Sequence, residues 1–414
     1  MGGQEGDNVS RKPWHSENWF VSPWNYAPEV TKDFAFSKRI KVHDITLRDG
    51  EQQAGIVFTR DEKVRIAEAL AEAGVHRIEA GMPAVSAQDA EAIREIVKRN
   101  LGPEIFAFSR CMVEDVKRAV DTGVKGIVME IPSSEHIIKY AYRWPLEEAL
   151  ERSIQATIYA RDQGLYVVFF PIDSSRAEIT WYLDLIEKVA TEGHMDALAV
   201  VDTFGVCSPH AISYLIRRTK ERISKPLETH FHSDFGMGVA NTVMALAEGA
   251  EVIHTTVLGI GERAGNTPME ETVMALRTMY DVDLGIKYDR LRQLAKLVQE
   301  LSGQAVPTNK PIVGDLLFNV ESGIIASWVK NCGDEHLTEV FPFRPEMVGQ
   351  DDPRVVLGKN SGLDSIVMKL FAMGRNATED QHQAILTQVK NESTSKKRLL
   401  TSEEFLSIVK TVLG

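Results

Sequence analysis

The amino-acid sequence predicts a (β/α)8 barrel followed by a small, mainly helical C-terminal region. Eight short runs rich in β-branched residues alternate with eight longer amphipathic stretches, which is the pattern of βα units around a parallel sheet. These units cover roughly 240 residues, close to the ~250 residues typical of such a barrel. Glycine follows several of the expected helices, where a left-handed C-cap favours it. A doubly wound open sheet is the alternative fold that the same rhythm allows.

The expected strands are rich in β-branched residues, and polar residues lie close to the C-terminal end of each one. They are Ile40–Ile45, Arg77–Ala80, Ile105–Phe108, Gly126–Ile131, Tyr166–Pro171, Ala197–Val201, Leu227–His232 and Val252–Val257. The expected helices share apolar residues at helical spacing. They are Asp61–Ala73, Ala87–Lys98, Val113–Thr122, Leu146–Gln163, Ile179–Thr191, Pro209–Arg222, Val239–Glu248 and Met269–Tyr280.

Three regions follow from this pattern. Residues 1–37 form an aromatic-rich N-terminal arm, residues 38–282 form the barrel and catalytic domain, and residues 283–414 form the helical C-terminal region. The helices expected in this last region are 283–305, 310–330 and two or three over 362–414, divided by the polar stretch Asn391–Lys397.

Composition excludes several classes of function. The formal net charge is −12 with no broad basic region, so we expect no nucleic-acid partner. No run of ~18 or more apolar residues indicates a membrane span and no signal peptide begins the chain, so we expect a cytoplasmic protein with no membrane partner. Cys111, Cys207 and Cys332 are widely spaced and form no CxxC pair, which indicates structural thiols in a reducing compartment.

A metal site is expected where the strands of the barrel end. His230 and His232 are two residues apart on the seventh expected strand, so their side chains leave the same face. Asp49 follows the first strand and Asn266 follows the eighth, and both strands lie near the seventh in a closed barrel. Two imidazoles, a carboxylate and an amide oxygen suit a catalytic divalent ion. Arg48 is placed to stabilise an alkoxide or enolate at that ion.

Five stretches of the chain carry a family resemblance. They are His43–Gln52 (HDITLRDGEQ), Glu79–Ala84 (EAGMPA), His230–Asn241 (HFHSDFGMGVAN), Gly259–Asn266 (GIGERAGN) and Leu357–Gly362 (LGKNSG). Together they resemble the signatures of the DRE-TIM metallolyases, or HMGL-like superfamily, and in particular its isopropylmalate, homocitrate and citramalate synthase branch. The resemblance covers roughly residues 38–365, in the family's order.

The resemblance implies a Claisen-type acyltransferase that condenses an acyl-CoA, acetyl-CoA foremost, with a 2-oxo acid. It implies a divalent metal ion, for which Zn, Mn, Co, Fe or Mg would serve, and a homodimer in which the C-terminal region acts as a lid. The metal ligands that it implies are Asp49, His230, His232 and Asn266. The catalytic residues are Arg48, Glu79 and Thr203, and the residues that bind the substrate are Gln52, Asp173, Arg176 and Thr203.

Three positions depart from the synthase pattern. Ile172 stands where the synthases have a glutamate, and Val320 and Ile325 stand where they have histidines, one of which is expected to help enolise the acyl-CoA. A metal-dependent lyase or aldolase that cleaves a 2-hydroxy acid or a 3-hydroxyacyl-CoA is therefore the alternative function. The loop Gly261–Gly265 lacks the cysteine of the lyases. A ligand-binding relative without catalysis is the third hypothesis.

Overall fold

The computed structural model describes residues 12–414 of the chain, so the first 11 residues of the N-terminal arm lie outside the described part. The described residues form two compact units. Trp24–Val306 form the barrel unit, and the residues up to Pro23 together with Pro307–Gly414 form the C-terminal unit. The two units are described in turn.

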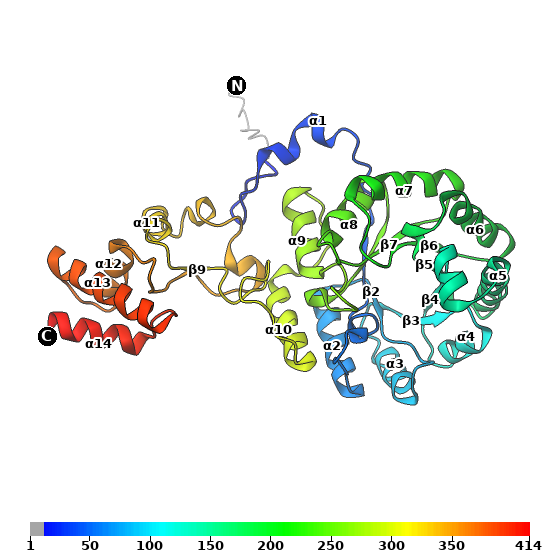
Figure 1. Ribbon diagram of the computed structural model, residues 1–414, viewed down its shortest axis with the longest axis horizontal. Coiled ribbons are helices and arrows are strands. Elements are labelled where there is room, and N and C mark those ends of the chain that lie inside the picture. The colour runs from blue at the N-terminus through cyan, green and yellow to red at the C-terminus, as the bar shows by residue number, and fades with distance from the viewer. Residues whose placement is uncertain (1–11) are drawn as a thin grey trace, which may run out of the picture. The chain divides into compact units, whose positions relative to one another are not determined.

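The barrel unit contains eight parallel strands that close into a barrel (Figure 1). The strands are β1 (Lys41–Asp44), β2 (Arg77–Glu79), β3 (Glu104–Arg110), β4 (Gly126–Pro132), β5 (Tyr166–Ile172), β6 (Ala197–Asp202), β7 (Leu227–Phe231) and β8 (Val252–Thr255). Strand β1 pairs with β8, from Lys41 opposite Val252 to Asp44 opposite Thr255, and also with β2. This closure confirms the (β/α)8 barrel and excludes the open sheet.

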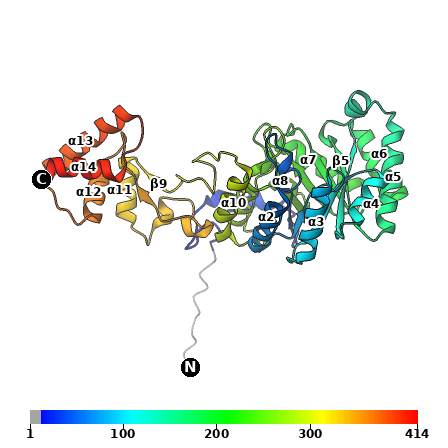
Figure 2. The same ribbon diagram turned by 90° about the horizontal axis from the view of Figure 1, so that it is seen from below.

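Helices cover the outside of the barrel, and Figure 2 shows α4, α5 and α6 beside β5. The helices of this unit are α1 (Pro28–Thr31), α2 (Arg60–Ala73), α3 (Ala87–Arg99), α4 (Val113–Val120), α5 (Leu146–Asp162), α6 (Ile179–Glu192), α7 (Pro209–Arg222), α8 (Gly238–Ala247), α9 (Met269–Met279) and α10 (Leu291–Ser302). The eight helices expected between the strands are confirmed to within a few residues at each end. The helix expected over 283–305 is shorter because it begins only at Leu291.

Local signals explain where these helices begin and end. Thr59 accepts a hydrogen bond from the backbone of Glu62, whose side chain accepts from the Thr59 backbone in return, so a capping box starts α2. Gly74 ends the same helix with φ of 90°, a conformation that costs glycine little. The side of α2 that faces the barrel buries Ile66 and Leu70 completely. Capping fixes the ends of the helix, and burial of apolar surface holds it against the sheet.

Residues 24–36, which precede β1, lie against the barrel helices. Tyr26 Oη donates a hydrogen bond to the carbonyl of Thr278 at 2.6 Å, and the backbone N–H of Ala35 donates to the carbonyl of Ala247 at 2.7 Å. Both acceptors belong to helices that follow the last strands of the barrel. Residues 24–36 therefore form part of the barrel unit.

The C-terminal unit has a separate apolar core. Its elements are β9 (Asn319–Val320), β10 (Arg354–Val355), α11 (Gly323–Cys332), α12 (Leu363–Ala372), α13 (Glu379–Lys396) and α14 (Ser402–Leu413). Helices α12, α13 and α14 pack around Ile366, Leu370, Ile385 and Phe405, which are buried. In Figure 1 these helices run from orange to red.

Two expectations for the C-terminal region are wrong. Residues 310–322 are not helical, because Ile312 has a left-handed φ of 67° and because Asn319–Val320 pairs with β10 as a strand. The polar stretch Asn391–Lys397 does not separate helices, since α13 runs through it to Lys396. A capping box at Thr378 starts α13 and one of its faces is buried, and this packing prevails over the polar composition.

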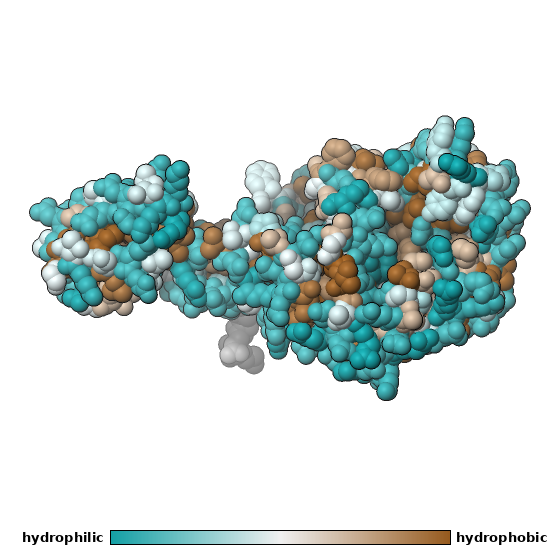
Figure 3. Space-filling model, turned by 60° about the horizontal axis from the view of Figure 1, so that its bottom comes forward, coloured by the Kyte–Doolittle hydropathy of each residue, from teal (hydrophilic) through white to brown (hydrophobic). Residues whose placement is uncertain are grey.

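Figure 3 shows mostly hydrophilic residues on the face that it presents, with hydrophobic residues gathered in separate patches. Among residues 12–414, no helix has the length and apolar character needed to cross a bilayer.

Candidate active site

The four expected metal ligands meet at the C-terminal ends of the strands. Asp49 follows β1, His230 lies in β7, His232 follows it, and Asn266 lies in the loop after β8. The Oδ2 atom of Asp49 lies 3.3 Å from Nε2 of His230 and 3.9 Å from Nε2 of His232. Its Oδ1 atom accepts a hydrogen bond from Nδ2 of Asn266 at 3.0 Å. All four side chains are buried.

These donors fit a divalent ion. One ligand atom from each of Asp49, His230 and His232 lies within 4.8 Å of the other two. The Oδ1 atom of Asn266 is buried without a hydrogen-bond partner in the described structure, and a metal ligand is one explanation for such an atom. Burial lowers the pKa of His230 to about 3 and also lowers that of His232, so both imidazoles are neutral at pH 7, as metal binding requires.

Asp49 is held in its charged form. Burial alone would raise the pKa of its carboxyl group, but the charge of Arg48 and the hydrogen bond with His230 hold this pKa well below its ordinary value. A carboxylate and two neutral imidazoles are the common ligand set of catalytic divalent metals.

Arg48 is fixed beside this cluster. Its Nε atom donates to Glu79, and its Nη1 atom donates to Asp49 at 2.8 Å and to Gln52 at 3.4 Å. The guanidinium also lies 3.9 Å from the centre of the Phe108 ring. Its Nη2 atom is buried with no partner in the described structure. Arg48 therefore has a fixed orientation and one donor left for a substrate oxygen.

Thr203, Asp173 and Arg176 form a second group, on the segments that follow β5 and β6. The two N–H groups of Arg176 donate to Asp173 at 2.7 and 2.9 Å, and its guanidinium lies 3.8 Å from the centre of the Phe204 ring. Thr203 Oγ1 accepts from the backbone N–H of Asp173 at 2.8 Å. Within residues 12–414, no hydrogen bond or ion pair joins a side chain of this group to the Asp49 cluster.

Three buried groups under the expected metal site were not among the expected site residues, and sequence reasoning missed two of them, Glu228 and His254. His254 in β8 and Glu228 in β7 are hydrogen bonded at 2.8 Å, and His43 in β1 lies 3.9 Å from Glu228. The signal in the sequence is the spacing of Glu228, His230 and His232, which places all three on one face of the strand.

Glu130 in β4 is a further carboxylate near the strand ends, outside the expected site residues. It is half-buried and accepts a hydrogen bond from Oη of Tyr142 at 3.2 Å. Burial raises its pKa, although the charge of Arg48 opposes this shift. A carboxyl group with a raised pKa near the ends of the strands has the properties of a general acid or base.

The motif at Leu357–Gly362 packs against α11 in the C-terminal unit. The backbone N–H of Asn360 donates to the carboxylate of Glu321 at 2.9 Å, and the carbonyl of Asn360 accepts from Gly323 at 3.0 Å. Val320 is buried and Ile325 is half-buried. The two positions that lack the histidines of the synthases are therefore packing positions in this chain.

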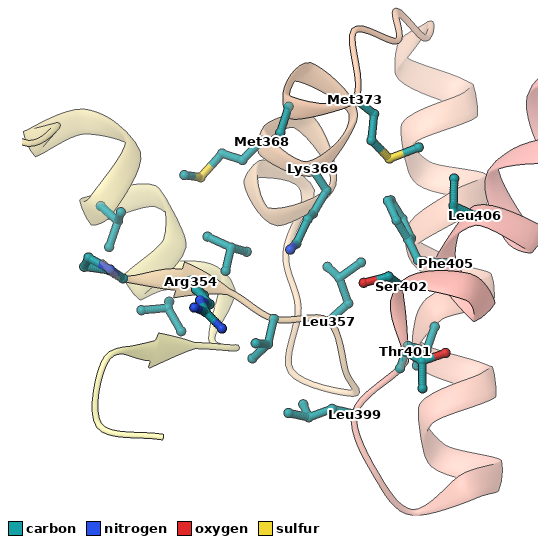
Figure 4. A pocket seen from close by; sticks show the side chains of 17 residues that line it. Arg354, Leu357, Met368, Lys369, Met373, Leu399, Thr401, Ser402, Phe405 and Leu406 are labelled. Carbon is teal, nitrogen blue, oxygen red and sulfur yellow. The ribbon is translucent and has the colours of Figure 1, made fainter. Parts of the chain in front are cut away.

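The C-terminal unit also contains a cavity of about 650 Å³ (Figure 4). Apolar side chains such as Leu357, Met373 and Phe405 line most of it, and the amino group of Lys369 points into it from α12. None of the site residues expected from the sequence lines this cavity. The candidate active site is the cluster at the end of the barrel.

Comparison with known proteins identifies sequence relatives over nearly the whole chain. Homocitrate synthase AksA of Methanothermobacter thermautotrophicus is 38% identical over 396 residues, which cover 96% of this chain and 98% of that protein. (R)-citramalate synthase CimA of Methanocaldococcus jannaschii is 37% identical, over 91% of this chain and 75% of that protein. A protein named "Probable 2-isopropylmalate synthase" from Methanopyrus kandleri is 40% identical, over 91% of this chain and 74% of that protein.

Solved structures agree on the fold. The crystal structure of the HMG-CoA lyase of Bacillus subtilis superposes with a TM-score of 0.60 at 20% identity, over 66% of this chain and 97% of that chain. Residues 39–298 match the model of the family named HMGL-like. The resemblance drawn from the five sequence motifs is confirmed, and the chain belongs to the HMGL-like family.

Proposed function

We propose that this protein is a metal-dependent acyltransferase that condenses an acyl-CoA, acetyl-CoA foremost, with a 2-oxo acid. Relatives named as homocitrate, citramalate and isopropylmalate synthases, at 37–40% identity over most of the chain, support the reaction class. The observation that carries the proposal is the buried cluster of Asp49, His230 and His232 with Arg48 fixed beside it.

Asp49, His230 and His232 would hold a divalent ion, with Asn266 as a further ligand. When bound, such an ion supplies Lewis-acid chemistry that polarises the carbonyl group of the 2-oxo acid and orients it. Zn, Mn, Co, Fe and Mg all remain compatible with this mixed ligand set.

Arg48 supplies a fixed positive charge where negative charge develops on the carbonyl oxygen. Glu79 and Asp49 hold its Nε and Nη1 atoms, so its Nη2 N–H needs no rearrangement before it donates to that oxygen. A donor that is already oriented in a buried site stabilises the transition state more than a mobile one. Glu79 is thus a residue that positions Arg48.

Thr203, Asp173 and Arg176 would bind the rest of the 2-oxo acid. The hydroxyl oxygen of Thr203 already accepts a hydrogen bond from the Asp173 backbone, so its O–H is available to donate to a substrate carboxylate. The Asp173 carboxylate holds the guanidinium of Arg176 through two hydrogen bonds. Gln52, bonded to Arg48, lines the same pocket in this proposal. The C-terminal region would act as the lid and contribute to a homodimer.

A thiol-release assay with acetyl-CoA and a panel of 2-oxo acids tests the function. We expect free CoA to appear only when the oxo acid is present, and Asp49→Ala to abolish this release. Asp61→Ala is the matched control, because this aspartate is 80% exposed on α2. Release of a 2-oxo acid from 2-hydroxy acids without CoA would instead favour the lyase. Ligand binding without turnover in either assay would favour the non-catalytic relative.

A further inference from the structure

A chain of buried polar groups runs from the expected metal site into the interior of the barrel. Glu228 and His230 are both in β7, two residues apart, and His254 is in the neighbouring strand β8. Their exposed fractions are 0%, 2% and 1%. Polar side chains buried this deeply are costly unless each one has a hydrogen-bond partner.

The contacts in this chain are continuous. Nε2 of His254 lies 2.8 Å from Oε2 of Glu228, and Nδ1 of His254 lies 3.3 Å from Nδ1 of His230. Nε2 of His230 then faces Oδ2 of Asp49 at 3.3 Å. At the other end, Oε1 of Glu228 accepts a hydrogen bond from Nη1 of Arg77 at 2.7 Å. The chain therefore ends on a carboxylate paired with a buried arginine.

The positions of the protons follow from these contacts. A metal ligand at Nε2 of His230 needs a lone pair there, so this neutral imidazole carries its proton on Nδ1. The N–H group at Nδ1 of His230 faces Nδ1 of His254. This atom must accept the hydrogen bond, so His254 carries its own proton on Nε2. An ionised carboxylate only accepts hydrogen bonds, and the carboxylate of Glu228 is placed to accept one from Nε2 of His254. With the metal at Nε2 of His230, each remaining donor of the chain meets an acceptor in this arrangement.

We propose that Glu228 and His254 are positioning residues that fix the orientation and tautomer of His230, so that its Nε2 atom binds the metal. The inference rests on the metal site of the proposed function. Carboxylates and carbonyls commonly orient a metal-binding histidine in this way, and here a second histidine lies between the two. In the described structure Nδ1 of His232 has no hydrogen-bond partner. Of the two expected histidine ligands, His230 is therefore the one whose orientation and tautomer are fixed by neighbouring side chains.

A second metal ion between His43, Glu228 and His254 is the competing interpretation, because their ligand atoms also lie close together. The contacts argue against it. The direct hydrogen bond at 2.8 Å already uses Nε2 of His254 and Oε2 of Glu228. The guanidinium of Arg77 lies on the same carboxylate, and its charge would repel a cation.

The test measures the affinity of the purified protein for Zn²⁺ by competition with a chelator. In Glu228→Gln, Arg77 holds the amide oxygen, so the NH₂ group faces His254. The proton of His254 then moves to Nδ1, and His230 must carry its proton on Nε2, where it blocks the metal. We expect the Kd for Zn²⁺ to rise about 10- to 100-fold.

Glu104→Gln is the matched control. Glu104 is the other carboxylate paired with Arg77, at 3.2 Å, and it belongs to β3. This variant loses the same charge next to the same arginine but keeps the hydrogen bond between Glu228 and His254. We expect its Kd for Zn²⁺ to equal that of the wild type. Equal affinities of Glu228→Gln and the wild type would overturn the proposal.

Variants of His254 keep the proposal testable if Glu228→Gln does not fold. His254→Gln can accept from His230 and donate to Glu228, so it should retain most of the affinity, whereas His254→Leu should lose it about 10- to 100-fold. Nitrogen NMR of the Zn²⁺-loaded wild type should show the proton of His254 on Nε2, and a proton on Nδ1 would contradict the proposal.

The stoichiometry of Zn²⁺ binding separates the possible failures. One Zn²⁺ per chain, lost in Asp49→Ala, is expected. Two per chain would favour the interior metal site and overturn the positioning role. If wild type and Asp49→Ala bind Zn²⁺ equally, the metal site of the proposed function is wrong, and the inference falls with it. If Asp49→Ala loses Zn²⁺ binding but Glu228→Gln binds Zn²⁺ as tightly as the wild type, the proposed function stands and the positioning role alone is wrong.

Discussion

Asn266 serves both its own loop and the candidate site. Its Nδ2 atom donates to Oδ1 of Asp49 at 3.0 Å and to the carbonyl of Ile260 at 3.1 Å. These two hydrogen bonds fix the amide plane and leave Oδ1 without a partner in the described structure. A side chain held by two bonds loses little further entropy when a ligand binds, which favours tight binding.

Asp44 predicts a pH dependence of stability. Its side chain is fully buried, and burial raises its pKa from 3.8 to about 7. Between these two values the unfolded chain loses the proton while the folded protein keeps it, so this carboxyl group lowers the free energy of unfolding as the pH rises from about 4 to 7. Asp44→Asn cannot ionise, so we expect this loss, about 4 kcal/mol at roughly 1.4 kcal/mol for each pKa unit, to be absent.

The measurement is urea unfolding of the wild type and Asp44→Asn at several pH values, with a chelator present. The free energy of unfolding of the variant minus that of the wild type should increase from pH 4 to pH 7 and then level off. A difference that does not change with pH would mean that Asp44 is charged in the folded protein throughout this range.

The loop after β8 is the element that presents Asn266, and its glycines allow its shape. Gly265 has φ of 84°, and a Cβ atom there would lie 1.9 Å from the carbonyl oxygen of Gly259. The carbonyl of Gly265 also accepts a hydrogen bond from the backbone of Ser233, next to His232. The loop therefore joins the end of β8 to the histidine segment.

Gly265→Ala should destabilise the barrel and weaken Zn²⁺ binding together, because the clash displaces the residue next to Asn266. Gly164→Ala is the control, since Gly164 has φ of 79° and nothing within 4 Å of an added Cβ atom. That control should cost only the backbone strain, about 1–2 kcal/mol, and leave Zn²⁺ affinity unchanged. Equal effects of the two variants on Zn²⁺ affinity would show that the contact with Gly259 is unimportant.

All the expected metal ligands belong to one of the two units, Trp24–Val306. A ligand that binds only the folded form stabilises it, by about 2.7 kcal/mol at 100 times its Kd. Hydrogen exchange followed by mass spectrometry should therefore show that Zn²⁺ slows exchange mainly in peptides of the barrel unit. Asp49→Ala should remove this protection. If Zn²⁺ slowed exchange in peptides of residues 307–414 as much as in those of the barrel unit, a site built from the barrel alone would be contradicted.

The barrel, and the proximity of the side chains in the candidate site, could be predicted from the sequence because both follow from local patterns. Strands and helices follow from the spacing of apolar residues. Once the barrel is assumed, the ends of β1, β7 and β8 must converge, and this brings Asp49 to His230. The break expected at the polar stretch Asn391–Lys397 is absent, because tertiary packing of α13 prevails over composition.

The order of the βα units, the strand face shared by His230 and His232, and the family motifs can all be read from the amino-acid sequence alone. Which side chains touch inside the barrel depends instead on how the strands pair. Val252 lies opposite Glu228 in the pairing of β7 with β8, and this register brings His254 next to Glu228 and His230. The register between two strands depends on how the whole barrel closes, so no local stretch of sequence specifies it.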